Sequence, residues 1–181
     1  MVAYHDEEWG VAVYDADALF ERLMLECFQA GLSWSTILKK RETFCAAFEG
    51  WNAARIAAYG DDDIARLLAD PGIIRNRAKV HAAIGNARAF LELQVEDGFS
   101  RFVWSFVGGS PFKRGLQPSG LAEFVATTPE SDAMSKALKQ RGFKFVGSTI
   151  CYAFMQSVGM VNDHEATCFR AVEVGVGARN Q

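Results

Sequence analysis

Apolar residues recur every three or four positions along most of this chain, the spacing of one face of an α-helix. The clearest run has its apolar positions at Leu19, Phe20, Leu23, Met24, Cys27 and Phe28. Asp15 or Asp17 can cap this helix, and Gly31 lies at its expected end. No stretch alternates strictly between apolar and polar residues over more than a few positions. We therefore predict an all-α fold.

Capping and turn residues divide the rest of the chain into further helices. Ser33 can cap a second helix that carries Ile37, Phe44 and Phe48 inward. The other predicted helices are short ones from Asn52 and Asp61, a long one from about Asn76 to Leu93, a short one capped by Ser100, one from Thr128 to Gly142 and one from Thr149 to Val158. Gly108 to Gly120 should be an irregular connection, because it is rich in Gly, Pro and Ser. No linker cuts the chain, so we expect one domain over residues 1–181.

The composition narrows the class of protein. The chain has 181 residues, of which 50% are hydrophobic and 23% charged, which is typical of a globular protein. No apolar run approaches the ~20 residues that cross a bilayer, no secretion signal is recognisable, and the four cysteines follow no disulfide spacing. We therefore expect a cytoplasmic protein that does not enter a membrane. The net charge of −3 disfavours bulk electrostatic binding of nucleic acid, so any polyanion site must be local.

Glu26 is the first candidate for chemistry. It lies seven residues after Leu19, so it falls about 20° from that residue around the helix, at the edge of the apolar stripe. Aromatic residues that can gather around it are Tyr4, Trp9 and Trp34. A carboxylate among aromatic planes suits a flat cationic or electron-poor ring. The alternative is a boundary glutamate that reaches water or pairs with Arg22, with the aromatics packed in the core.

A second candidate is the segment LLADPGIIRNRAKV, which predicts a helix, a tight turn and another helix. Exposed N–H groups at the Pro71–Gly72 turn can bind an anion, and Arg75, Arg77 and Lys79 can extend the site along a phosphate backbone. This interpretation is a helix-hairpin-helix. The alternative is a solvated basic start of a helix.

The third candidate is a metal site. His164 and Cys168 are four residues apart, the spacing that places two ligands on one helical face, and His5 can supply a third. These ligand types favour zinc. No fourth ligand is evident from the sequence, and the alternative is a capping histidine beside a buried thiol.

Several of these segments together resemble the DNA-3-methyladenine glycosylase I family, a branch of the helix-hairpin-helix DNA glycosylases. The matching strings are AYHDEEWG, LECFQAGLSW, ILKKRE, PGIIRNRAK, AIGNARA, FVWSFV and SKALKQRGFKFVGSTICYAFMQSVGMVNDH. The resemblance covers roughly Ala3 to Cys168. It implies helical lobes around a base-binding cleft.

The resemblance also implies an activity: a monofunctional enzyme that flips 3-methyladenine out of alkylated double-stranded DNA and hydrolyses its N-glycosidic bond, leaving an abasic site. Glu26 would meet the base as the catalytic residue, with Tyr4, Trp34 and Trp9 as its aromatic walls. The pair Gly31 and Leu32 would enter the DNA where the base has left. The hairpin would bind phosphates through the residues Pro71, Gly72, Arg75, Arg77 and Lys79. We expect a monomer that releases 3-methyladenine as product.

The metal site departs from the family pattern. His5, His164 and Cys168 match three ligands of the family's structural zinc site. The family's fourth ligand is a cysteine upstream of the segment equivalent to AYHDEEWG, and the sequence begins at Met1 without that cysteine. Either the native start lies upstream of Met1, or this member holds a weaker three-ligand site or none. We therefore expect weaker zinc binding, a loosely held tail beyond Cys168 and a base pocket that survives metal loss. Asp97 is not assigned a role, because the resembled family is described as working without the catalytic aspartate of its superfamily.

Two rival interpretations come from other classes of protein. One is a non-catalytic helical DNA-binding protein that uses the same hairpin. Such a protein would not need Glu26 together with Trp34. The other is an oligomerising helical scaffold, which the basic hairpin disfavours.

Overall fold

The computed structural model describes residues 1–111, 125–165 and 167–176. Within these ranges no residue lies in a β-strand, which confirms the all-α prediction. The elements are α1 (Val2–Glu7), α2 (Ala16–Gln29), α3 (Trp34–Lys39), α4 (Arg41–Ala47), the 3-10 helix η1 (Glu49–Trp51), α5 (Ala53–Ala57), α6 (Asp61–Ala69), α7 (Arg77–Glu96), α8 (Phe99–Ser105), α9 (Pro129–Gln140), α10 (Ser148–Ser157) and α11 (Phe169–Val176). None of these helices is both long and apolar enough to cross a membrane.

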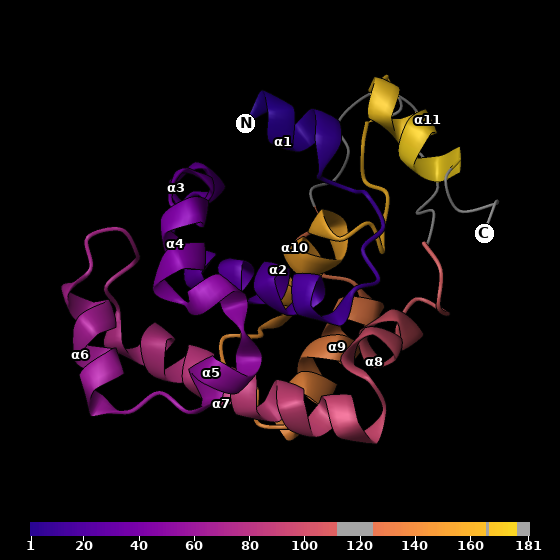
Figure 1. Ribbon diagram of the computed structural model, residues 1–181. Helices are drawn as coiled ribbons and strands as arrows, with labels where there is room; N and C mark the ends of the chain where they lie inside the picture. The colour runs from indigo at the N-terminus through magenta and orange to yellow at the C-terminus, as the bar shows by residue number, and fades with distance from the viewer. Residues whose placement is uncertain (112–124, 166, 177–181) are drawn as a thin grey trace.

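Helix α2 is the centre of the molecule. Every residue from Arg22 to Phe28 is buried, and the helix packs against α3, α7, α8 and α10. Figure 1 shows α3 to α6 on one side of it and α8 to α10 on the other, while α7 runs beneath. Asp15 caps α2 by accepting a hydrogen bond from the Ala18 amide at 2.9 Å. Because α2 touches both sides, a polar residue on it is placed between two helical lobes.

One continuous apolar core joins the two sides of the molecule. On the α4 side, rings pack around Phe48, which stacks on Trp51 with centroids 4.7 Å apart. On the α7 side, Phe90 contacts Phe20 at 4.7 Å and Phe99 at 5.0 Å. Buried aromatic pairs of this kind stabilise a fold beyond the area they bury, so the lobes are fixed against α2.

Several predicted boundaries were wrong by a turn or less. The second helix is two helices, α3 and α4, because Lys40 leaves helical geometry with ψ of 3°. Helix α6 begins at Asp61 as predicted, whereas Gly98 and not Ser100 precedes α8. Helix α7 continues beyond Leu93 to Glu96. Of the predicted irregular connection, residues 112–120 lie outside the described residues.

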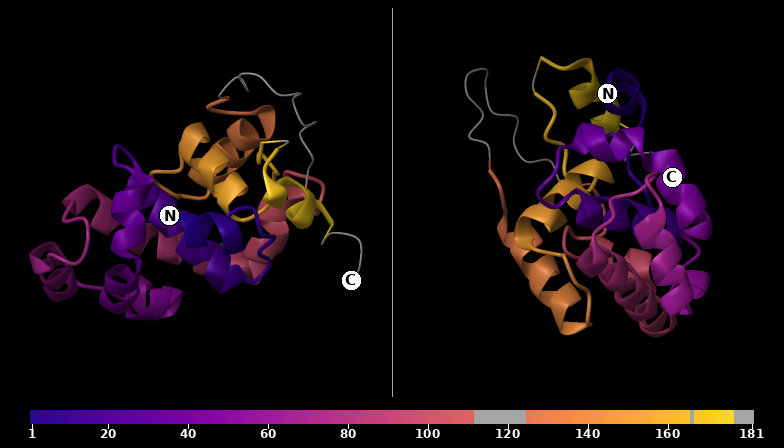
Figure 2. Two further views of the ribbon diagram at one scale, coloured as in Figure 1. Left: turned by 90° about the horizontal axis from the view of Figure 1, so that it is seen from above. Right: turned by 90° about the vertical axis from the view of Figure 1, so that its left-hand side faces the viewer.

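Two helices near the chain ends were not predicted. Helices α1 and α11 lie side by side in both Figure 1 and Figure 2, and His5 of α1 meets Phe169 of α11 with ring centroids 6.3 Å apart. Asn162 donates a hydrogen bond to the Ala171 carbonyl at 3.0 Å. The chain beyond Cys168, expected to be loosely held, is therefore helical as far as Val176.

Gly159 lets the N-terminal segment cross the end of α10. Its φ is +71°, and a Cβ at this position would come within 2.6 Å of the Ala12 amide nitrogen and the Gly10 carbonyl oxygen. Val13 donates a hydrogen bond to the Val158 carbonyl at 3.2 Å beside this crossing. The contact brings the segment after α1 back onto α10, next to α2.

Candidate functional site

Glu26 is a buried carboxyl in the middle of α2. Its residue is only 3% exposed, and its Oε2 atom has no hydrogen-bond partner among the described residues. Burial raises the pKa of Glu26 to about 8, although the charge of Arg22 and the hydroxyl of Ser157 act in the opposite direction. A buried carboxyl oxygen without a partner carries a cost in folding, so this atom is available to a ligand.

Tyr4 and Trp34 form an aromatic wall at the same place. Tyr4 is buried on α1, Trp34 is the first residue of α3, and their ring centroids lie 5.3 Å apart at 45°. Burial raises the pKa of the Tyr4 hydroxyl, and the charge of the nearby Glu26 acts in the same direction. The hydroxyl therefore stays protonated and can donate a hydrogen bond. The Trp34 indole Nε1 is buried without a hydrogen-bond partner in the described part of the chain. The structure thus brings together Tyr4, Glu26 and Trp34, as the sequence predicted.

Trp9 contacts different residues. Its ring stacks on His5 with centroids 6.2 Å apart and meets the edge of His164 at 4.5 Å. The ring contacts of Trp9 are thus with the predicted metal ligands. Among the described residues no ring contact joins Trp9 to Tyr4 or Trp34, so its place in the wall of the base pocket stays a prediction.

An ion-pair network adjoins the pocket, and sequence reasoning missed most of it. Arg22 donates from Nη2 to Glu8 Oε2 at 2.5 Å, and Arg41 donates to the same oxygen at 2.6 Å. Arg41 also donates from Nε to Glu21 at 3.0 Å. The predicted alternative paired Arg22 with Glu26, whereas Arg22 forms its ion pair with Glu8, on the segment that follows α1. No sequence spacing signals a contact between residues 14 positions apart.

Gly31 and Leu32 form the exposed turn that follows α2. Gly31 has a φ of +79°, a left-handed conformation that glycine adopts without a Cβ penalty. Leu32 is 41% exposed, and the next residue, Ser33, caps α3. An apolar side chain at the tip of a short turn beside the pocket is suited to enter a base stack.

Lys79 was expected to bind phosphate, but the structure gives it another role. The residue is 7% exposed, and its ammonium donates to the carbonyls of Phe28 at 2.8 Å and Ala30 at 2.6 Å. These are carbonyls at the C-terminal end of α2, where a cation interacts favourably with the helix dipole. Lys79 therefore fixes the start of α7 to the end of α2, immediately before Gly31, and is not free to contact DNA.

The predicted hairpin is present between α6 and α7. The Gly72 amide donates to Asp70 Oδ1 at 2.6 Å, and Thr43 of α4 donates to the Gly72 carbonyl at 2.6 Å. Arg75 and Arg77 are exposed. The turn is therefore held by α4, and the two arginines face solvent at the start of α7.

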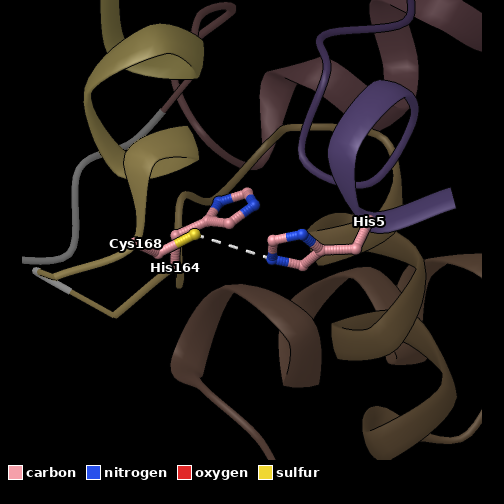
Figure 3. Close-up of side chains that lie close together, drawn as sticks. All are labelled: His5, His164 and Cys168. Atoms are coloured by element: carbon pink, nitrogen blue, oxygen red, sulfur yellow. Dashed lines mark hydrogen bonds between the residues drawn. The ribbon is translucent and has the colours of Figure 1, made fainter. Parts of the chain in front are cut away.

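The three predicted metal ligands lie together (Figure 3). One ligand atom from each of His5, His164 and Cys168 falls within 4.8 Å of the others, and Cys168 Sγ is 3.6 Å from His5 Nε2. His5 belongs to α1, whereas the other two ligands lie between α10 and α11. Burial, with the nearby His5 and Arg170, lowers the pKa of His164 to about 4, so its ring is neutral at pH 7.

The surroundings of both histidines fit a metal. His164 Nδ1 lies 3.0 Å from Asn162 Oδ1, and its buried Nε2 has no hydrogen-bond partner among the described residues. His5 Nδ1 lies 2.8 Å from Asp6 Oδ1. An imidazole that donates from Nδ1 to such an oxygen presents Nε2 as a lone pair, the arrangement found around zinc-bound histidines. Within the described residues no fourth His, Cys, Asp or Glu joins the group.

Asp97 lies apart from this chemistry. It is an exposed residue at the end of α7, 3.8 Å from Arg101 in an i,i+4 pair.

Comparisons with known proteins agree with the sequence resemblance. The family model described as methyladenine glycosylase matches residues 1–171. The chain is 52% identical over 168 residues to DNA-3-methyladenine glycosylase 1 of Escherichia coli (strain K12), covering 92% of this chain and 89% of that protein. It is 45% identical to DNA-3-methyladenine glycosylase of Haemophilus influenzae, covering 92% and 90%.

A solved structure shares the fold. The structure of 3-methyladenine DNA glycosylase I from Staphylococcus aureus, which describes recognition of 3-methyladenine, superposes with a TM-score of 0.88 at 37% identity, covering 93% of this chain and 89% of that one. Buried carboxylate, aromatic wall and hairpin thus occur on a fold already known in this class of enzyme. The chain belongs to the methyladenine glycosylase family.

Proposed function

We propose that this chain excises 3-methyladenine from alkylated DNA by hydrolysing the N-glycosidic bond, as a base-excision repair glycosylase that leaves an abasic site. The observation that carries the proposal is the buried, unpartnered carboxyl oxygen of Glu26 beside Tyr4 and Trp34. The names of the relatives, DNA-3-methyladenine glycosylases, support it. The enzyme is accordingly a hydrolase that acts on N-glycosyl bonds.

The pocket can stabilise a cationic base in three ways. Glu26 accepts a hydrogen bond from the donor edge of the base and offsets its positive charge. This electrostatic interaction is strong because water is excluded from the site. Tyr4 and Trp34 present ring faces and edges to a delocalised cation. When the bond breaks, its electron pair stays with the base and cancels the charge, while water adds to the sugar carbon and releases one proton to solvent. Because the methylated base leaves readily, binding and orientation supply most of what the protein must add.

Two surface elements would hold the DNA. Leu32 would occupy the space left by the flipped base, and Arg75 and Arg77, beside the Pro71–Gly72 turn, would bind phosphates. Lys79 supports this arrangement indirectly, since it ties the end of α2 to the start of α7. The partner we propose is alkylated double-stranded DNA.

The test is an assay of bases released from DNA treated with a methylating agent. We expect free 3-methyladenine to appear with stoichiometric abasic sites, and unmodified adenine to stay in place. Intact DNA binding without any released base would instead establish the rival function, a non-catalytic helix-hairpin-helix binder. Chromatography of the released bases also reveals whether 3-methylguanine is a substrate.

We further propose that His5, His164 and Cys168 bind zinc. Bound zinc would act structurally, by tethering α1 to the segment before α11. Three protein ligands leave a position for water or another donor, so binding should be weaker than in a closed four-ligand site. Elemental analysis of protein purified without chelator tests this: partial zinc that EDTA removes is expected, and absence of zinc after reconstitution would refute the site.

Removing the metal should affect the pocket only in part. Glu26 and Trp34 lie on α2 and α3, but Tyr4 directly precedes His5 on α1. We therefore expect excision to fall modestly in EDTA and to recover with added zinc. Excision abolished by EDTA would mean that α1 depends entirely on the metal.

Two expectations on setting complete the proposal. Four free cysteines favour a reducing cytoplasm. The residues of the proposed base pocket all come from one chain, so the enzyme should act as a monomer, which sedimentation at assay concentration can check.

A further inference from the structure

Arg22 occupies an unusual position for a cation, inside the wall of a pocket that we propose for a cationic base. It lies one helical turn before Glu26 on α2, and its side chain is only 10% exposed. Its guanidinium carbon lies 5.7 Å from the centroid of the Tyr4 ring. The buried arginine thus contacts one pocket residue and shares a helix face with another.

The contacts of Arg22 largely neutralise its charge toward the base. Its Nη2 is bound to Glu8, which also accepts from Arg41, while Arg41 reaches Glu21. Partial burial acts to raise the pKa of Glu8, but hydrogen bonds from Arg41 and Arg22 outweigh burial and hold that pKa below its usual value. Two arginines and two carboxylates therefore balance one another. The charge of the whole cluster is then decided by whether Glu26 is ionised.

Two buried polar atoms of this cluster are unused by the fold. Arg22 Nη1 and Glu26 Oε2 both lack a hydrogen-bond partner among the described residues, and they belong to side chains one helical turn apart. The other groups that act on Glu26 are neutral: the Ser157 hydroxyl from α10, the Tyr4 phenol from α1 and the Cys27 thiol on its own helix. Arg22 is the nearby positive charge that favours the carboxylate form.

We propose that Arg22 is a positioning residue that favours the carboxylate form of Glu26 for the incoming base and holds Tyr4 against α2. The inference rests on the proposed function. Burial alone would leave Glu26 a neutral acid, which cannot offset a positive charge. An arginine beside it lowers the pH at which the carboxylate forms, and the ion pair with Glu8 reduces the repulsion that the same arginine exerts on the cationic base.

The pH profile of single-turnover kcat/KM tests the proposal, because it reports the ionisation of the free enzyme. Excision by the native protein should rise with pH, reach half of its maximum near pH 8, the pKa of Glu26, and level off above that pH. Arg22→Met keeps the aliphatic length and removes the charge, so the rising limb should move up by about one pH unit or more. At a pH below the limb, moving the limb up by one pH unit lowers the rate about tenfold. Arg22→Lys keeps a positive charge, so its rising limb should lie close to that of the native protein.

Arg41→Met is the matched control. It removes a guanidinium from the same Glu8 carboxylate, but Arg41 is not among the groups that act on Glu26. This variant should lose stability without moving the limb. A limb that stays in place in a folded Arg22→Met protein, or that moves equally in Arg41→Met, would overturn the proposal. If Arg22→Met does not fold, Arg22→Gln decides by the same criterion.

A direct titration separates this inference from the proposed function. The side-chain carboxyl of Glu26 can be followed by NMR in protein carrying ¹³C-labelled glutamate, with Glu26→Gln to assign its signal. We expect a higher apparent pKa in Arg22→Met than in the native protein even without DNA. Unchanged titration would refute the role of Arg22 whether or not the enzyme releases 3-methyladenine.

Discussion

Replacing Lys79 with methionine tests the role that the structure gives this residue. The ammonium makes two short hydrogen bonds, to the carbonyls of Phe28 and Ala30, from a site that is 7% exposed. Lys79→Met removes the charge and both bonds but preserves most of the side-chain volume. The two carbonyls at the end of α2 then lose their partner.

The size of the effect follows from these contacts. A hydrogen bond to a charged group contributes about 1.5–3 kcal/mol, so two contribute at most about 6 kcal/mol. Methionine avoids the cost of burying an ammonium, which returns roughly half of this amount. We therefore expect a loss of about 3 kcal/mol in the free energy of unfolding. For a chain of this length that corresponds to a fall in Tm of about 6–12 °C.

Thermal and urea unfolding followed by circular dichroism measure this loss. Lys39→Met removes the same charge from an exposed position on α3 and should change stability by less than about 0.5 kcal/mol. The salt dependence of DNA binding should be unaltered in Lys79→Met under conditions where it is folded. A variant with native stability and a shallower salt slope would refute the capping role and place Lys79 on phosphate.

Three further predictions concern the DNA interface, the pocket and the fold. Arg77→Glu should weaken DNA binding and reduce its salt slope by about one, and an unchanged slope would remove the hairpin from the interface. The pKa of Glu26 is about 8 in the folded protein against an ordinary value of 4.5, so the folded protein holds this proton more tightly than the unfolded chain does. Stability should then fall as pH rises from about 4.5 to 8, by at most about 1.4 kcal/mol per pH unit from this group, and Glu26→Gln should abolish that contribution. Gly159→Ala should destabilise the protein by about 2 kcal/mol or more, because its Cβ has no room beside Gly10 and Ala12; an unchanged Tm would contradict the tight crossing.

Much of the fold was predictable because its long helices carry regular apolar faces and recognisable caps. Asp15, Asn76 and Thr128 each accept the capping hydrogen bond expected of them. The two terminal helices were not predicted. Helix α1 has six residues and α11 has eight, too few for periodicity to identify either of them. Their positions depend on contacts between the two ends of the chain, which no local pattern encodes.

The site was predictable where a residue type demanded a special environment. A carboxylate at the edge of an apolar stripe pointed to Glu26. His164 and Cys168 do lie together, but the expectation that they share one helical face was wrong, because both belong to the segment between α10 and α11. Predictions from proximity in sequence were less successful. Lys79 follows two exposed arginines yet turns inward, because a long lysine side chain can reach the free carbonyls of another helix. The partnership of Arg22 with Glu8 likewise arises only once α1 and α2 are packed together.

The most direct test of the account is the single-turnover rate of 3-methyladenine release by Glu26→Gln. This substitution keeps the shape of the side chain and removes the negative charge that we propose offsets the cationic base. Circular dichroism and Tm first establish that the variant is folded. We predict a rate at least about tenfold below that of the native protein above pH 8, equivalent to over about 1.4 kcal/mol. Equal rates in the folded variant and the native protein would contradict the assignment of Glu26 and with it the proposed base pocket.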